Sequence, residues 1–311
     1  FFFHAHAGIR DPLWSRGLGD VYKRQDTGSF HAAAEKMCVT QSAVSMQMKN
    51  LEEQLQMELF ERTVRPPRLS NTAKLMIEKL RDIIDLSDDL LNVSPVSSQL
   101  TGSIKIGTIP GVSFLLPNTL FDLREKYKHL QVRVSSDYTG ELVDMVLNGK
   151  LDAAIVSEPE VLDTHLVSRQ FLTEPMVVLA PKKFTGLSDE ELLISNHFIS
   201  FNRKAEVSRR IEEELNKRKI DIDPIMELDT LETFQNMVLR GLGVGILPIS
   251  SVRKHFLNDF YIVPFGSPPL QRTITLIQRK KHHRTLFLDA LFNALDKTIS
   301  KYNRSSKKMS F

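Results

Sequence analysis

Between residues 103 and 285, short apolar segments rich in β-branched residues alternate with amphipathic helical segments. Strands are expected at 103–109, 131–135, 153–156, 176–179, 197–201, 225–228, 244–247, 261–263 and 273–277. Helices are expected near 115–127, 142–147, 207–219 and 231–239, with a closing helix from about residue 286. This alternation favours mainly parallel sheets with helices on both faces. The stretch is longer than one small sheet needs, so it predicts two α/β lobes with a cleft between them.

The segment before this alternation is helical. A first helix has apolar residues at i, i+3, i+4 and i+7, which are Phe30, Ala33, Ala34 and Met37. A second helix is expected after the N-cap Thr40, with an apolar stripe at Val44, Met48, Leu51 and Leu55. Only a few residues connect the two helices, so the pair predicts a helix-turn-helix.

A basic segment follows the second helix. Pro66 and Pro67 exclude a helix there, and residues 62–74 hold four basic and no acidic side chains. This composition predicts an exposed hairpin or wing. From Ser70 a heptad seam predicts a longer helix, with apolar positions at Ala73, Ile77, Leu80, Ile84 and Leu91. We expect this helix to dimerise the chain, the alternative being that it packs on its own domain, and residues 94–102 are expected to be a linker.

The second helix carries short polar side chains opposite its apolar stripe. Gln can bond adenine edges, Ala can contact a thymine methyl, and Ser and Thr suit bases or phosphates. A helix N-terminus also offers free amide donors to a phosphate. The candidate DNA-contacting residues are therefore Thr40, Gln41, Ser42, Ala43, Ser45 and Lys49 on the helix, and Arg62, Arg65 and Arg68 in the wing. On these residues alone, an ordinary helical hairpin remains the alternative.

Charge and cysteine content limit the function classes. The formal net charge of +3 is small, which excludes a uniformly basic nucleic-acid coat and makes any nucleic-acid contact local. The single cysteine, Cys38, excludes an internal disulfide and fits a reducing compartment. No apolar run approaches the ~18 residues of a membrane span. We therefore expect a cytoplasmic protein without membrane contact.

Short motifs occur in a fixed order along both halves of the sequence. In the first half they are Gly28-Ser29-Phe30, Ala33-Ala34, Thr40-Gln41-Ser42-Ala43-Val44-Ser45, Leu51-Glu52 and Leu59-Phe60-Glu61-Arg62. In the second half they are Ile104-Lys105-Ile106-Gly107, Leu115-Leu116-Pro117, and residues 149–155 and 241–248. Together they resemble LysR-type transcriptional regulators over about residues 26–295.

The resemblance implies an all-α winged helix-turn-helix with a long linker helix, followed by an α/β effector domain of two lobes like type 2 periplasmic binding proteins. It also implies homodimers or homotetramers that bind double-stranded promoter DNA, respond to a small-molecule effector and contact RNA polymerase. Two positions depart from the family pattern. Met46 stands where the family often has Arg, and Lys74 replaces a Gly after the wing, with Ser70 for Thr.

The effector is expected in the cleft, at the carboxyl ends of strands. Ser113 is expected to cap the next helix, whose N-terminus would favour an anionic ligand such as a small carboxylate. The candidate effector-binding residues are Thr108, Ile109, Pro110, Ser113, Tyr138 and Thr139, and by the resemblance Phe201, Asn202 and Thr230. The alternative is that these are ordinary turn and cap residues.

Other signals are set aside. Gly241-x-Gly243-x-Gly245 follows a helix and precedes a strand, the reverse of a dinucleotide fingerprint. His4, His6, His282 and His283 lack further ligands at metal spacing and are expected to be exposed, and Cys38 is expected to be a buried small side chain. No nucleophile with a base is visible, so we expect neither a cofactor, a metal nor an enzyme. A solute-binding protein on the same fold, without DNA binding, is the alternative function.

The first 25 residues differ from the rest, because Pro and Gly stand where the family places an amphipathic helix. We interpret residues 1–25 as a leader foreign to the gene. The expected domains are then residues 26–70 for a partial DNA-binding domain, 71–93 for the linker helix and 94–102 for a hinge. Residues 103–171 with 268–300 form effector lobe I, 172–267 form lobe II, and 301–311 are a basic tail.

Overall fold

The chain divides into two compact units, residues 1–91 and 92–311, in a computed structural model. The structure describes residues 40–61, 68–70, 72, 73, 76, 102–203, 205–252, 256–282 and 284–306. The predictions for residues 1–25, the first helix near residue 30, Cys38, Arg62, Arg65 and most of the linker helix lie outside these residues.

In the first unit, helix α3 (Gln41–Leu55) begins where the sequence predicts. Thr40 is its N-cap, and the Thr40 side chain accepts a hydrogen bond from the backbone N of Ala43 at 3.2 Å. The strands β1 (Phe60–Glu61) and β2 (Arg68–Leu69) pair antiparallel, so they bracket the expected wing as a hairpin. Leu51, Leu59, Phe60 and Ala73 are buried.

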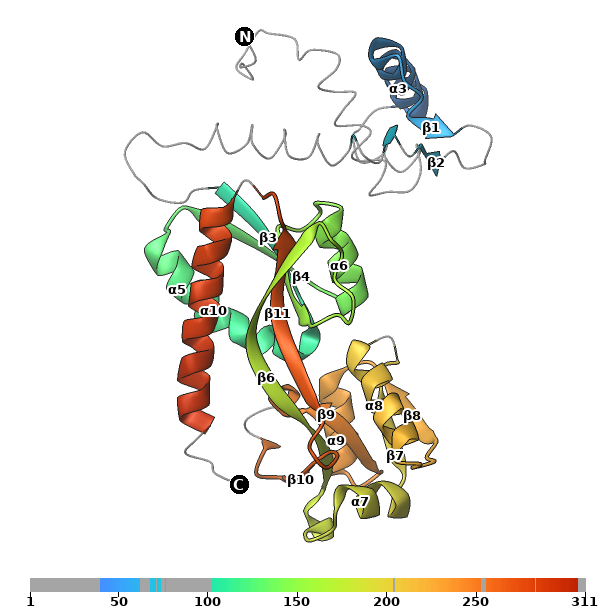
Figure 1. Cartoon of the computed structure of the whole chain (residues 1–311), viewed down its shortest axis with the longest axis vertical. Helices are drawn as coiled ribbons and strands as arrows, with labels where there is room; N and C mark the ends of the chain where they lie inside the picture. Colours follow the sequence, from blue (N-terminus) through green and yellow to red (C-terminus); the bar gives the residue numbers. More distant parts are fainter. Residues whose placement is uncertain are drawn as a thin grey trace. The chain divides into compact units, whose positions relative to one another are not determined.

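The second unit contains the predicted alternation of strands and helices (Figure 1). Its first part consists of β3 (Gly102–Thr108), the 3-10 helix η1 (Pro110–Leu115), α5 (Leu116–Lys126), β4 (Leu130–Ser136), α6 (Thr139–Leu147) and β5 (Ala153–Ser157). Its middle part consists of β6 (Leu166–Pro181), η2 (Lys182–Phe184), α7 (Asp189–Ser195), β7 (Phe198–Phe201), α8 (Glu206–Lys217), β8 (Pro224–Leu228), α9 (Leu231–Leu239), β9 (Val244–Pro248) and η3 (Ile249–Ser251). It ends with β10 (Phe260–Pro264), β11 (Gln271–Arg279) and α10 (Thr285–Ser306).

Within the described residues these strands form one sheet in the order β4-β3-β5-β11-β6-β9-β7-β8, with β10 beside β6. Strands β4, β3 and β5 are parallel, and so are β9, β7 and β8. Strands β6 and β11 run antiparallel side by side through both halves (Figure 1). The expectation of mainly parallel sheets is therefore wrong, because β6 leads the chain into the second half and β11 returns it.

Each half of this sheet has its own hydrophobic core. In the first half, strands β3 and β5 pack against residues of α5, α6 and α10, such as Leu123, Leu142 and Leu291. In the second half, two cores lie around Val178 and Leu179, adjacent residues of β6. Because side chains of adjacent strand residues point to opposite faces, the second half is covered on both faces. Among the described residues no helix is both long and apolar enough to cross a bilayer.

Candidate functional site

The exposed start of helix α3 carries the side chains expected to contact DNA. Thr40, Gln41, Ser42, Ser45 and Lys49 are exposed and Ala43 is half-buried. Thr40 Oγ1 lies 3.0 Å from Ser42 Oγ, and Lys49 Nζ lies 3.7 Å from Glu53 Oε1. No acidic residue occupies the first turn, so nothing there repels a phosphate.

The expected wing residues are only partly described. Arg68 lies in β2, opposite Glu61, whereas Arg62 and Arg65 lie outside the described residues. Met46 is 69% exposed on α3, although it is a large apolar side chain. The roles of all these residues toward DNA stay predictions.

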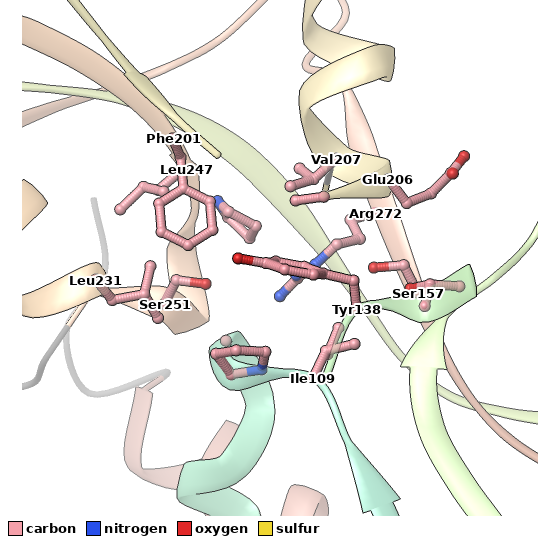
Figure 2. A pocket seen from close by; sticks show the side chains of 15 residues that line it. Ile109, Tyr138, Ser157, Phe201, Glu206, Val207, Leu231, Leu247, Ser251 and Arg272 are labelled. Carbon is pink, nitrogen blue, oxygen red and sulfur yellow. The ribbon is translucent and has the colours of Figure 1, made fainter. Parts of the chain in front are cut away.

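A small pocket lies in the second unit, between its two halves (Figure 2). Its free volume is about 30 Å³, far below the ~300–1,000 Å³ of typical small-molecule sites. One wall comes from the end of β3, from η1 and from the start of α6, and the other from β7, α8, α9, β9 and η3. Its lining residues are Ile109, Pro110, Gly111, Tyr138, Thr139, Ser157, Phe201, Ala205, Glu206, Val207, Leu231, Leu247, Pro248, Ser251 and Arg272. We call this the cleft pocket.

Five of the predicted effector-binding residues line the cleft pocket, namely Ile109, Pro110, Tyr138, Thr139 and Phe201. The buried Thr108 donates to the carbonyl of Ile109 at 3.3 Å and does not line the pocket. Asn202 lies beside it, because its Nδ2 donates to the hydroxyl of Tyr138 at 2.6 Å. Burial, together with the carboxylates of Asp229 and Asp137, raises the pKa of Tyr138, so this hydroxyl stays neutral near pH 7.

Ser113 and Thr230 lie outside the lining of the cleft pocket. The prediction that Ser113 caps a helix is wrong, since η1 begins at Pro110 and Ser113 Oγ donates to the Pro110 carbonyl at 2.9 Å. Proline fixes a backbone angle suited to a first helical turn, which starts the helix earlier than expected. Thr230 is the N-cap of α9 and accepts from the backbone N of Thr233 at 3.4 Å.

The one buried cation in the pocket lining is Arg272, which was not predicted. Its side chain is 4% exposed and pairs with Glu174, which is 3% exposed and directly opposite on β6. Glu174 Oε1 accepts from Nη2 of Arg272 at 2.5 Å and from Nε at 3.0 Å. Figure 2 shows the guanidinium pointing into the pocket beside Tyr138.

Ser250 completes this buried cluster from η3. Its Oγ donates to Glu174 Oε1 at 2.9 Å, and its backbone N donates to Oε2 at 2.8 Å. The carboxylate is therefore held from both oxygens, which fixes the guanidinium geometrically. Sequence patterns could not find this cluster, because Glu174 and Arg272 lie 98 residues apart in different strands.

The structure also describes one of the four histidines and the glycine run to which the sequence assigns no function. His282 is buried rather than exposed: its Nε2 lies 3.2 Å from Asp152 Oδ1, and its Nδ1 accepts from the backbone N of Arg284 at 3.1 Å. The glycine run follows helix α9, as predicted, and leads into strand β9, which includes Gly245. The described part of the chain holds no group of three His, Cys, Asp or Glu side chains that could bind a metal ion.

Family models match most of the chain. The model "LysR substrate binding domain" matches residues 97–299, and "Bacterial regulatory helix-turn-helix protein, lysR family" matches residues 23–74. A curated relative, the HTH-type transcriptional regulator SoxR of Arthrobacter sp. (strain TE1826), is 31% identical over 229 residues, covering 72% of this chain and 76% of the relative. A probable RuBisCO transcriptional regulator of Cyanidium caldarium is 27% identical over 271 residues, covering 83% and 85%.

Solved structures share the fold. A full-length OxyR variant from Pseudomonas aeruginosa is 23% identical, covers 93% of this chain and 95% of its own, and superposes with a TM-score of 0.67. Full-length BenM is 20% identical, covers 94% and 98%, and has a TM-score of 0.57. At these identities the structures show the fold alone.

Proposed function

This chain belongs to the LysR family of transcriptional regulators, and from that premise we propose which of its residues read DNA and which hold its effector. It is a ligand-responsive regulator with a helix-turn-helix DNA-binding domain and an effector domain. The alternative of a solute-binding protein loses its basis, because residues 23–74 match the family's DNA-binding model.

The proposed domain limits follow the sequence. Residues 26–70 form the DNA-binding domain, 71–93 the linker helix and 94–102 the hinge. Lobe I comprises residues 103–171 and 268–300, and lobe II comprises 172–267. The separate hydrophobic cores of the two halves support this division.

For DNA, we assign base reading to Gln41, Ser42, Ala43 and Ser45 at the start of α3. Thr40, Lys49 and the wing arginines Arg62, Arg65 and Arg68 are assigned to phosphates. The exposure of the described helix residues supports this assignment, and so does the absence of acidic groups in the first turn.

The effector is a small anion that binds in the cleft pocket. The observation that carries this proposal is the buried guanidinium of Arg272 in the pocket lining. Glu174 binds Nε and Nη2 of that guanidinium, and Nη1 lies on the side of Gly111, where a Cβ atom would be 3.4 Å away. Its N–H groups suit a carboxylate oxygen, since a charged donor makes shorter and stronger bonds to an anion.

Binding is proposed to separate the two lobes. A space of about 30 Å³ is too small for most metabolites, so an effector must widen it. The bond between Tyr138 and Asn202 joins the lobes beside the pocket and would break on opening. We propose that this change is transmitted to DNA-bound homodimers or homotetramers and alters contact with RNA polymerase. The protein would act without catalysis or cofactor, in the cytoplasm where bacterial DNA lies.

Isothermal titration with a panel of small carboxylates and their neutral amides tests the effector class. We expect carboxylates to bind the full chain, and Arg272→Ala to abolish binding while Arg272→Lys retains part of it. Arg169→Ala is the control, because Arg169 pairs with Asp289 and lies outside the pocket lining. Binding of amides alone, or equal losses in the Arg272→Ala and Arg169→Ala variants, would refute the assignment.

A further inference from the structure

Met46 is an apolar residue on the exposed side of helix α3. Its side chain is 69% exposed, and among the described side chains of α3 it is the one large apolar group that is exposed. A single exposed apolar residue is common on protein surfaces, so exposure alone assigns no function. What distinguishes Met46 is its place on the helix and the polar groups on either side of it.

The place of Met46 follows from helix geometry. Residues three or four positions apart lie on the same face of an α-helix. Met46 comes four residues after Ser42 and three before Lys49, and both of these are exposed and assigned to DNA. Leu51, five positions after Met46, is 2% exposed and marks the buried side of the helix. Met46 therefore lies within the face of α3 that is proposed to read DNA.

The direction of the side chain brings Met46 toward the base-reading end of α3. Long side chains in an α-helix lean toward the helix N-terminus, over the preceding turn. For Met46 that turn holds Ser42, whose Oγ lies 3.0 Å from Thr40 Oγ1. On the other side of Met46, Lys49 Nζ lies 3.7 Å from Glu53 Oε1. Met46 thus presents an apolar surface between two polar groups that already interact within their own helix and its cap.

The chemistry of the major groove contains one good partner for such a side chain. A thioether is only a weak hydrogen-bond acceptor, so Met46 gains little from the polar edges of bases or from phosphate. The apolar group that base pairs display in the major groove is the C5 methyl group of thymine. Methionine is unbranched and flexible, so its side chain can adapt to the position of that methyl group. Contact between the two removes apolar surface of both from water.

We propose that Met46 selects a thymine in the target sequence by contact with its C5 methyl group. This inference rests on the proposed function, in which the start of α3 reads bases. Gln41, Ser42 and Ser45 are suited to hydrogen bonds with base edges. Met46 adds recognition of a group that takes no part in hydrogen bonding.

The test removes only the methyl group from the DNA. The probe is a duplex enriched from a random-sequence library by binding to the unaltered chain, and each of its thymines in turn is replaced by deoxyuridine. Gel-shift titration measures the affinity of the unaltered chain, Met46→Ala and Met57→Ala. Met57→Ala is the matched control, since Met57 is 46% exposed but lies beyond the end of α3.

The variant and the modified base should act on the same contact. Deoxyuridine at the thymine that Met46 contacts should weaken binding of the unaltered chain about fourfold, or about 0.8 kcal/mol, the value of one buried CH₂ group. Met46→Ala should weaken binding to the unmodified probe by about the same factor and lose nothing further on deoxyuridine at that position, so the two losses do not add. Met46→Leu should retain part of the thymine preference, because it keeps an apolar side chain. Met57→Ala should behave like the unaltered chain.

The contrary results point to different errors. A deoxyuridine loss that persists in Met46→Ala and disappears in Ala43→Gly would assign the methyl contact to Ala43, which is half-buried on the same helix. If Met46→Ala weakened binding to random-sequence DNA as much as to the probe, Met46 would not read a base. An enriched probe on which deoxyuridine has no effect at any position would overturn this inference alone. Failure to enrich any sequence would overturn the proposed base reading itself.

Discussion

Asn202 Nδ2 donates a hydrogen bond of 2.6 Å to the hydroxyl of Tyr138 and so joins the residue that follows β7 to the residue that precedes helix α6. The two residues are 64 positions apart, and they come from opposite sides of the cleft pocket. The bond can exist only while the two halves are close together. It therefore reports the closed arrangement of the effector domain.

Tyr138→Phe removes this bond but keeps the ring in the pocket lining. We expect the free energy of unfolding of the effector domain to fall by about 0.5–1.5 kcal/mol, the net value of such a bond. Urea unfolding followed by circular dichroism measures it. In a double-mutant cycle with Asn202→Ala the two losses should not add, because both variants break one bond. Tyr261→Phe is the control, since Tyr261 bonds Leu187 outside the pocket. Fully additive losses would contradict the assigned bond.

The DNA-contact assignment separates two kinds of residue. Gln41→Ala should reduce affinity for the specific promoter while leaving nonspecific DNA unaffected, because a base contact carries the sequence information. Arg65→Ala and Arg68→Ala should weaken binding to specific and nonspecific DNA alike. Each should also reduce the slope of log affinity against log salt concentration by about 1, because binding of each variant releases one counterion fewer. Gel-shift titrations at several salt concentrations measure both effects. Identical behaviour of Gln41→Ala and Arg68→Ala would refute the division of roles.

Glu52 ties the DNA-reading helix to the wing. Its Oε1 accepts from the backbone N of Leu59 at 2.8 Å and of Phe60 at 3.1 Å, which satisfies two donors at the start of β1. Glu52→Ala leaves these partly buried donors unpaired, so we expect a loss of about 1–3 kcal/mol in domain stability. Glu52→Gln keeps the acceptor oxygen and should recover part of it. Glu53→Ala is the control, because Glu53 is exposed and forms an exposed ion pair with Lys49. Equal stability of the two Glu52 variants would exclude this role.

The elements that the sequence predicts best are those with an unbroken local pattern. Helix α9 has the predicted bounds, because its apolar residues recur with helical period. Strand β6 was expected only at 176–179 yet begins at Leu166, because polar residues such as Arg169 and Glu174 interrupt its pattern. Helix α7 was missed because it has only seven residues.

Local patterns also explain why the sequence predicts some residues of the cleft pocket and not others. Tyr138 and Phe201 lie at the ends of local elements, where a strand pattern locates them. Arg272 instead reaches the pocket from within β11, and its burial depends on Glu174 in a distant stretch of the chain. No local pattern contains that pairing.

Packing explains the last glycine of the run, Gly245, which lies in strand β9. A Cβ atom on Gly245 would lie 2.2 Å from Cζ of the buried Phe234 and 2.9 Å from the carbonyl oxygen of Ile199. Gly245→Ala should therefore lower the free energy of unfolding by about 1–3 kcal/mol, the usual cost of overpacking a core. Gly140→Ala is the matched control: nothing lies within 4 Å of its added methyl, and it sits in helix α6. That variant should be neutral or slightly stabilising. Thermal unfolding compares the two, and equal midpoints would contradict the packing argument.

Asp152 predicts how the stability of the effector domain depends on pH. Its Oδ2 accepts from the backbone N of Lys105 at 2.7 Å, and its Oδ1 lies 3.2 Å from Nε2 of His282. Burial opposes ionisation, but the bonds from His282 and Lys105 and the charge of Arg284 outweigh it. The pKa of Asp152 is therefore held below its ordinary value.

The sign of the pH effect follows from this lowered pKa. Unfolding returns Asp152 to an ordinary pKa of about 3.9, so its contribution to stability is present above about pH 4 and is lost as pH falls through the folded-state pKa. Asp152→Asn should reduce stability at neutral pH, and its difference from the unaltered chain should shrink steadily on acidification. Asp163→Asn is the control, because Asp163 also has a lowered pKa from bonds with His165 but its side chain is 42% exposed and screened by water. Urea unfolding at a series of pH values measures both. If the difference in unfolding free energy between Asp152→Asn and the unaltered chain stayed constant into acid, the pKa of Asp152 would be the same in the folded and unfolded states.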